Sequence, residues 1–203
     1  MVRYPRGHKE KTREQIVDTA ARAFREDGVA GVGIGELMGR AGLTHGGFYA
    51  HFPSKDALVA EACSRAVEDS WAQMNELVAQ APPGQELAAF IRGYVSRTHR
   101  DDPGGGCMMP TLGAEMPRQA PEVRAAFTAQ IRRVMDNLVA LLPDTPDRED
   151  RAITLLSGMA GAVMVARAVD DPALSDRILK LNRDFWTQQF AGGAPGAPPA
   201  ALL

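Results

Sequence analysis

The chain has 203 residues, enough for one large hydrophobic core or for a small module joined to a larger one. Hydrophobic residues make up 45% and charged residues 24%, which is ordinary for a soluble globular protein, and no apolar run approaches the length needed to span a bilayer. The first residues are basic, but no apolar stretch follows them, so we expect no secretory signal and a cytoplasmic protein without membrane partners.

The formal net charge of −2 is unevenly distributed. Residues 1–55 contain nine Lys/Arg against six Asp/Glu, or +3, and the remainder carries −5. A basic end on an acidic body favours a module that faces nucleic acid. The two cysteines, Cys63 and Cys107, make neither a disulfide framework nor a zinc site, so we expect free thiols and neither a metal nor a cofactor.

Apolar residues recur with helical periodicity almost throughout, and no stretch alternates as a strand does. The first three predicted helices cover residues 10–27, 34–41 and 45–51. Gly42 is expected to end the second helix, and Thr44 is placed as the N-cap of the third.

The remaining helices are predicted to form a larger bundle. They cover residues 55–80, after an N-cap at Ser54, and residues 85–100, 107–116, 122–142, 147–169 and 173–190. The pattern therefore predicts an all-α protein of about nine helices, with an N-terminal three-helix domain over residues 1–54 and a C-terminal helical bundle over residues 55–190. Residues 191–203 form a Gly/Pro/Ala-rich tail, which we expect to be disordered.

Residues 34–52, IGELMGRAGLTHGGFYAHF, have the spacing of a helix-turn-helix: two short helices joined by a tight turn that contains glycine. In such a unit the second helix enters the major groove of DNA. Glycines there weaken a helix but let backbone approach the duplex. The residues placed to reach DNA have small or polar-tipped side chains: Thr44, His45, Gly46, Gly47, Tyr49 and His51.

The run LTHGGFYAHFPSKDAL, residues 43–58, resembles the signature of the TetR family of bacterial repressors, and IVDTAARAFREDGV, residues 16–29, resembles the family's first helix. The similarity covers about residues 10–60, and the rest matches in helix number, length and order. The resemblance implies that Tyr49, His51 and Lys55 contact DNA phosphates. It also implies that the four residues from Thr44 to Gly47 sample base edges.

The chain departs from the family pattern just before and within the first short helix of the motif. Val32 and Gly33 stand where the family usually has Thr or Ser, and Gly35 stands where a polar or basic DNA contact is common. We therefore expect one phosphate contact and one helix cap to be weaker. Arg40 is expected to compensate by contacting DNA.

The resemblance implies a homodimer that binds a double-stranded, palindromic operator through residues 1–54. It also implies that residues 55–190 dimerise and bind a small effector, which we expect to be apolar or electrophilic. Our hypothesis is that the effector releases the repressor by shifting the helix over 55–80. A transcriptional activator of the same fold, and a helical interaction protein that has lost DNA binding, are alternatives. Glu115 has the pattern of a helix-end charge, and the sequence shows no catalytic triad, metal cluster or phosphate loop, so we expect no enzymatic activity.

The last two predicted helices combine small residues with an apolar stripe, which favours a four-helix dimer interface. The alternative is that this stripe is buried within one chain. The predicted interface residues are Leu155, Gly158, Met159, Ala162, Leu174, Ile178, Leu181 and Phe185.

The effector pocket is less well specified, because methionines and aromatic residues suit a pocket and a core equally. The candidates are Tyr94, His99, Cys107, Met108, Phe127 and Met164. Cys107 follows three glycines and is expected at a helix N-terminus, where the helix dipole favours a thiolate. We therefore expect Cys107 to be a candidate sensor of electrophiles or oxidants, with a structural role as the alternative.

Overall fold

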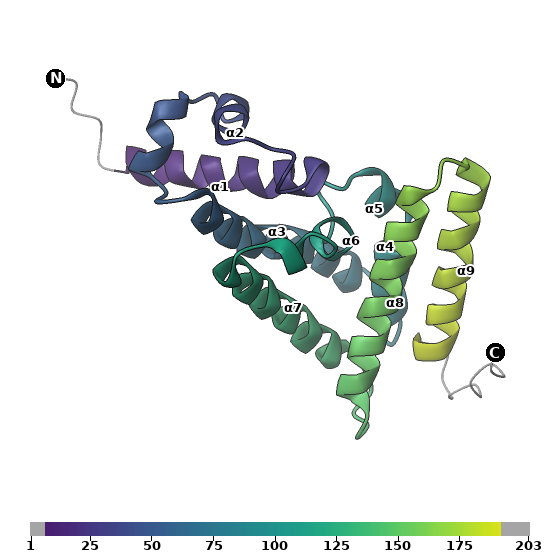
Figure 1. Cartoon of the computed structure of the whole chain (residues 1–203). Helices are drawn as coiled ribbons and strands as arrows, with labels where there is room; N and C mark the ends of the chain where they lie inside the picture. The colour runs from purple at the N-terminus through teal and green to yellow at the C-terminus, as the bar shows by residue number, and fades with distance from the viewer. Residues whose placement is uncertain (1–6, 192–203) are drawn as a thin grey trace. The chain divides into compact units, whose positions relative to one another are not determined.

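The computed structural model describes residues 7–191, and Figure 1 shows its helices. Within that range the secondary structure is helical, without a strand, which confirms the predicted all-α class. The predicted disordered tail lies outside the described residues, apart from Ala191 at the end of the last helix. In chain order the helices are α1 (His8–Asp27), α2 (Ile34–Arg40), the 3₁₀ helix η1 (His45–Ala50), α3 (Lys55–Ala79), α4 (Glu86–Tyr94), α5 (Arg97–Asp101), α6 (Met109–Leu112), the 3₁₀ helix η2 (Met116–Arg118), α7 (Pro121–Leu141), α8 (Arg148–Ala168) and α9 (Pro172–Ala191).

The chain forms two compact units, whose limits differ from the division predicted at residue 54. Unit 1 comprises residues 1–71 and 102–134, and unit 2 comprises residues 72–101 and 135–203. Helices α3 and α7 each begin in unit 1 and end in unit 2. Long helices carry no local signal for the point at which their packing partners change, and the division into functional domains at residue 54 stays a prediction.

Unit 1 is built around the apolar stripe of α1. Ile16, Ala20 and Phe24 are buried, as the helical periodicity predicts, and so are Leu37 and Met38 of α2. α1 therefore forms the base on which the two short helices of the helix-turn-helix are held.

In unit 2, α8 and α9 are antiparallel neighbours, and α9 also packs against α4 (Figure 1). Gly158 of α8 permits the close approach, because a Cβ there would lie 2.0 Å from Cζ2 of Trp186. By length and composition α8 could cross a membrane, so the expectation that no segment could do so is wrong. Eight α8 residues are nevertheless buried in the protein, and the core helix of a soluble protein can have the same length and apolar composition.

The helix predicted over residues 85–100 is divided into α4 and α5. The backbone leaves the helix at Val95, and the hydroxyl of Ser96 accepts a hydrogen bond from the His99 amide at 3.1 Å. Ser96 thus caps a new helix instead of continuing the old one, since a serine side chain competes with the helical backbone for local hydrogen bonds.

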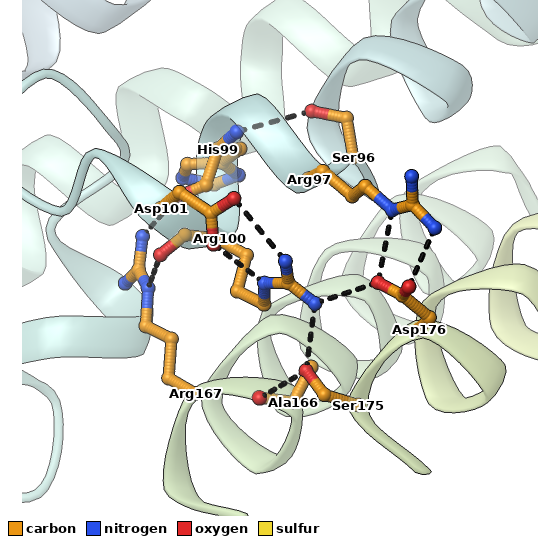
Figure 2. A network of polar contacts seen from close by, with 9 residues as sticks. All are labelled: Ser96, Arg97, His99, Arg100, Asp101, Ala166, Arg167, Ser175 and Asp176. Atoms are coloured by element: carbon orange, nitrogen blue, oxygen red, sulfur yellow. Dashed lines mark hydrogen bonds and ion pairs between the residues drawn. The ribbon is translucent and has the colours of Figure 1, made fainter. Parts of the chain in front are cut away.

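A polar network holds α5 against the α8–α9 corner (Figure 2). Arg97 and Arg100 each donate to Asp176 of α9, at 2.9 Å, and Arg100 also donates to Ser175 at 2.8 Å. Ser175 in turn donates to the last turn of α8, at the carbonyl of Ala166. The position of α5 is therefore fixed by charge-assisted hydrogen bonds rather than by a buried face, because none of its residues is buried.

Candidate nucleic-acid interface

The turn between α2 and η1 has the geometry that the sequence predicts around Gly42. Gly42 adopts a positive φ of 68°, and the Leu43 amide donates to the carbonyl of Met38 at 2.8 Å. This is the Schellman arrangement, in which a left-handed glycine ends a helix. Gln15 of α1 donates a hydrogen bond to the carbonyl of Ala41 at 2.8 Å. The end of α2 is therefore held both by its own backbone and by a side chain of α1.

The second helix of the motif is a 3₁₀ helix rather than an α-helix. Thr44 occupies the N-cap position in extended conformation, but its side chain makes no capping hydrogen bond, so the predicted cap is wrong in that respect. Two weak helix formers, Gly46 and Gly47, occupy its first turn, and two buried aromatic rings, Phe48 and Phe52, anchor its last turn. The aromatic anchors therefore set the geometry of η1.

Anchoring one side of η1 leaves the other side in solvent. Tyr49 is 65% exposed, while its ring packs edge-on against Phe48 with centroids 5.2 Å apart. Thr44, His45 and Gly46 are exposed as well. The residues that were predicted to sample base edges, together with the tyrosine, thus share an accessible edge, whereas Gly47 and His51 are half-buried.

Gly35 lies beside this edge, since a Cβ at that position would be 3.9 Å from Cδ2 of His45. The predicted loss of a helix cap before α2 is confirmed, because Gly33 at the N-cap position makes no side-chain hydrogen bond. A larger residue at position 35 would contact the His45 ring. Because Gly33 and Gly35 have no side chains, His45 is the main side chain at the start of η1.

Two predicted phosphate contacts are occupied elsewhere. Nζ of Lys55 donates to the carbonyls of Val29 and Val32, at 2.5 and 2.6 Å, and burial lowers its pKa. Arg40 pairs with Asp27 at 2.7 Å and Glu36 at 2.6 Å, and hydrogen bonds to these carboxylates raise its pKa. In the free protein both cations thus fix the turn before α2 or α2 itself, because orphan carbonyls and neighbouring carboxylates compete for them. Their contacts with DNA stay predictions.

Sequence reasoning missed the residues that hold the α1–α2 turn from the distant part of unit 1. Glu115, predicted to be only a helix-end charge, accepts from the amides of Val29 and Ala30 at 3.1 and 3.3 Å. Arg25 is 4% exposed and donates to the carbonyls of Ala66 and Gly106, at 3.2 and 2.9 Å. Separations of 41 to 86 residues gave no local signal for these contacts.

Cys107 is not at a helix N-terminus. It lies two residues before α6, a helix of four residues, and is 8% exposed. Its neighbour Gly106 accepts a hydrogen bond from Arg25, and the charge of Arg25 interacts with Cys107. A guanidinium thus replaces the predicted helix dipole as the positive group near this thiol. Burial raises the pKa of the other cysteine, Cys63, to about 11.

The other predicted ligand residues do not come together in one site. Among them, Tyr94 and His99, both in unit 2, are in contact. Their rings meet edge-on with centroids 4.6 Å apart, and Nδ1 of His99 lies 2.7 Å from the Tyr94 carbonyl. Met108 is buried and Phe127 half-buried, both in unit 1. Met164 is 45% exposed on α8, and its place in an effector pocket stays a prediction.

The predicted dimer residues on α8 also need correction. Leu155, Met159 and Ala162 are buried in the protomer, and Gly158 faces Trp186 of the same chain. On α9, Ile178 is half-buried, while the other predicted residues are exposed. The apolar residues in solvent on these two helices are Ile153, Met164, Val165, Leu174, Leu181 and Phe185, which we call the α8–α9 exposed set. The register was misassigned because α8 is apolar around most of its circumference.

Comparison with known proteins shows which family the chain belongs to. Residues 16–62 match the family model described as bacterial regulatory proteins, tetR family, and residues 83–181 match the tetracyclin repressor-like C-terminal domain. The chain belongs to the TetR family. It is thus a regulatory protein of the helix-turn-helix class, as the sequence resemblance predicted.

Three relatives show how far the likeness extends. The chain is 29% identical to the uncharacterized helix-turn-helix transcriptional regulator Rv0196 of Mycobacterium tuberculosis over 184 residues, which is 85% of this chain and 93% of that protein. It is 33% identical to the regulator YerO of Bacillus subtilis over 94 residues, 44% of this chain but only 32% of YerO. A TetR regulator from Chloroflexus aurantiacus superposes with a TM-score of 0.72 at 26% identity, covering 90% of this chain and 97% of the other. Several curated relatives, YerO among them, are thus matched over only about a third of their length.

Lys55→Met tests whether this lysine is a structural tie. Removing two hydrogen bonds from a charged donor while keeping an apolar stem of similar length is expected to lower the free energy of unfolding by about 1–3 kcal/mol, measured by urea denaturation at fixed protein concentration. The matched control is Lys9→Met at an exposed position of α1, expected to change stability by less than about 0.5 kcal/mol. Unchanged stability in Lys55→Met, with a salt dependence of DNA binding shallower by about one phosphate contact, would instead identify a phosphate anchor.

Proposed function

We propose that the protein is a cytoplasmic, non-enzymatic repressor that binds a specific DNA operator as a homodimer and leaves it when an effector binds. The observation that carries the DNA-binding part is the division of η1 into two sides. Phe48 and Phe52 hold one side in the core, and His45 and Tyr49 stand in solvent on the other. A short helix held in this way can enter a major groove without losing its shape.

The distribution of free cations supports the same proposal. Lys9 and Lys11 are exposed in the first turn of α1, in the same unit as η1. Cations in such positions can neutralise DNA phosphates, which supply most of the sequence-independent affinity. His45 and Thr44 are then the side chains available to read base edges, with the glycines allowing close backbone approach.

Selection of genomic duplex fragments by the purified protein tests DNA recognition. We expect a short palindrome, bound with an affinity that falls steeply as salt rises, and about tenfold weaker binding by Tyr49→Ala, since one phosphate hydrogen bond is lost. Arg124→Ala, which removes an exposed charge on α7, is the control and should bind as the wild type does. If no fragment is enriched, the protein is better explained as a helical interaction protein; transcription in vitro from the selected site separates repressor from activator.

Dimerisation is proposed through the α8–α9 exposed set. Its members are between 38% and 55% exposed, and they project from two helices that already pack together within the protomer. Two copies related by a two-fold axis would bury them in a four-helix arrangement. Burial of such side chains is worth roughly 1.5–3 kcal/mol each, so leaving the whole set in water is unfavourable.

Leu181→Glu tests this surface. A charge in a dry interface is expected to weaken the dimer at least tenfold, measured by sedimentation equilibrium over a range of protein concentrations. Leu77→Glu is the matched control, because Leu77 is 48% exposed on α3 and does not belong to the α8–α9 exposed set. A wild type that stays monomeric, or two variants with equal dissociation constants, would contradict the proposed surface.

Effector release is proposed to act through the part of unit 1 that holds the α1–α2 turn. Glu115 and Arg25 connect this turn and α1 with residues 106 and 115 by hydrogen bonds. A movement of residues 106–115 would therefore alter the position of α1 relative to α2 and η1. For release, the effector must bind the moved state more tightly than the DNA-bound state.

Cys107 is proposed as the attachment point for an electrophilic effector, since modification of its thiol would displace the adjacent contact between Gly106 and Arg25. Treatment with N-ethylmaleimide at neutral pH should abolish operator binding by the wild type and by Cys63→Ser, and spare Cys107→Ser. The raised pKa of Cys63 keeps that thiol protonated under these conditions. Unchanged operator binding by the fully alkylated wild type would refute the sensor role.

A further inference from the structure

Arg151 in the first turn of α8 is an unusual cation. It is half-buried, and its Nε is fully buried without a hydrogen-bond partner. Among the arginines of residues 7–191 that are not fully exposed, it alone has no hydrogen bond or ion pair between its guanidinium and a carboxylate or carbonyl, although its charge interacts through space with the exposed Asp147 one turn earlier. The others, Arg13, Arg25, Arg65, Arg100, Arg148, Arg167 and Arg183, all have such a partner.

The guanidinium is positioned by an aromatic ring instead. Its Cζ lies 5.0 Å from the ring centroid of Phe190, near the end of α9. Stacking of this kind stabilises the cation and fixes its plane, but it satisfies no N–H group. Arg151 therefore retains unused donors in a defined orientation.

A pocket of about 530 Å³ adjoins this guanidinium, and all of its lining residues belong to unit 2. Its lining includes Arg151 from the first turn of α8 and three residues from the end of α9, Gln189, Phe190 and Ala191. Its apolar lining comes from Leu87, Leu141, Leu142, Pro143 and Phe190. Thr145 and Gln189 add neutral polar groups, and the one carboxylate in the lining, Glu86, forms no ion pair with Arg151. The pocket thus combines a cation that lacks a hydrogen-bonded anion with apolar walls.

We propose that this pocket binds an organic carboxylate with an apolar body. The carboxylate accepts the free donors of Arg151, whose planar fork matches a carboxylate bidentately, and the hydrocarbon part covers the leucine and proline surface. A neutral apolar ligand would displace water from the guanidinium without offering a hydrogen-bond acceptor in its place, which is unfavourable. A small inorganic anion would leave the apolar walls in water and gain nothing from them.

This site goes beyond the proposed function and is separate from its surfaces. None of its lining residues belongs to η1 or to the α8–α9 exposed set, and none is among the ligand residues predicted from the sequence. Binding measured without DNA therefore succeeds or fails independently of operator recognition.

The test compares octanoate with octan-1-ol on the full-length wild-type protein by isothermal titration calorimetry at neutral pH. The two probes share the same chain length and differ in charge, so we expect octanoate to bind about tenfold to hundredfold more tightly, as charge-assisted hydrogen bonds predict. Trp186, whose ring lies 5.7 Å from that of Phe190, provides a second readout by fluorescence.

Arg151→Met, which keeps the apolar stem and removes the charge, is expected to reduce octanoate affinity to that of the alcohol. Arg177→Gln, an exposed arginine on α9 outside the pocket, is the matched control and should bind octanoate as the wild type does. Equal binding of acid and alcohol by the wild type, no binding of either, or undiminished octanoate binding by Arg151→Met would each overturn the proposal. The wild-type comparison decides the matter even if Arg151→Met does not fold.

Discussion

The segment that presents Tyr49 to solvent is too short and too rich in glycine to hold its own shape. α2 has seven residues and η1 has six, and isolated helices of such length are unstable in water. Their form depends on two buried aromatic residues, Phe48 and Phe52, whose rings stack 5.8 Å apart. Cζ of Arg13 in α1 lies over the Phe52 ring, 4.5 Å from its centroid, and the same guanidinium pairs with Glu61 of α3. The accessible edge of η1 is thus a consequence of how firmly its other side is buried.

A second constraint is that the turns around these short helices leave backbone carbonyls without partners. Basic side chains from other elements satisfy them: Lys55 at the turn before α2, and Arg25 at Gly106 before α6. In unit 2, Arg167 does the same for α5, donating to the Arg100 carbonyl at 2.9 Å. A net charge of +3 over residues 1–55 therefore overstates what is available to DNA, because several of these cations are already engaged by the protein itself.

The apolar residues of α8 show how one helix can serve two surfaces. Leu155 and Met159 face the protein interior, while Met164 and Val165 face solvent. In an ordinary amphipathic helix the side that faces solvent is polar. The exposed residues fit a contact with a second copy, and the first turn of the same helix carries Arg151, which faces a pocket instead. The proposed dimer surface and the proposed ligand pocket thus use different side chains of one helix.

The sequence by itself determined the all-α class, the stripe of α1, the turn at Gly42 and the exposure of Tyr49. These follow from local rules: the period of apolar residues, the left-handed preference of glycine, and the composite motif over residues 43–58. Only the tertiary structure decided that Lys55 and Arg40 are engaged within the protein, that Glu115 holds the α1–α2 turn, and which side of α8 is buried. It also showed that Cys107 lies near Arg25 rather than at a helix start. The physical reason is that each of these depends on a partner far away in the chain, and a long side chain bonds to whichever group the fold brings within reach.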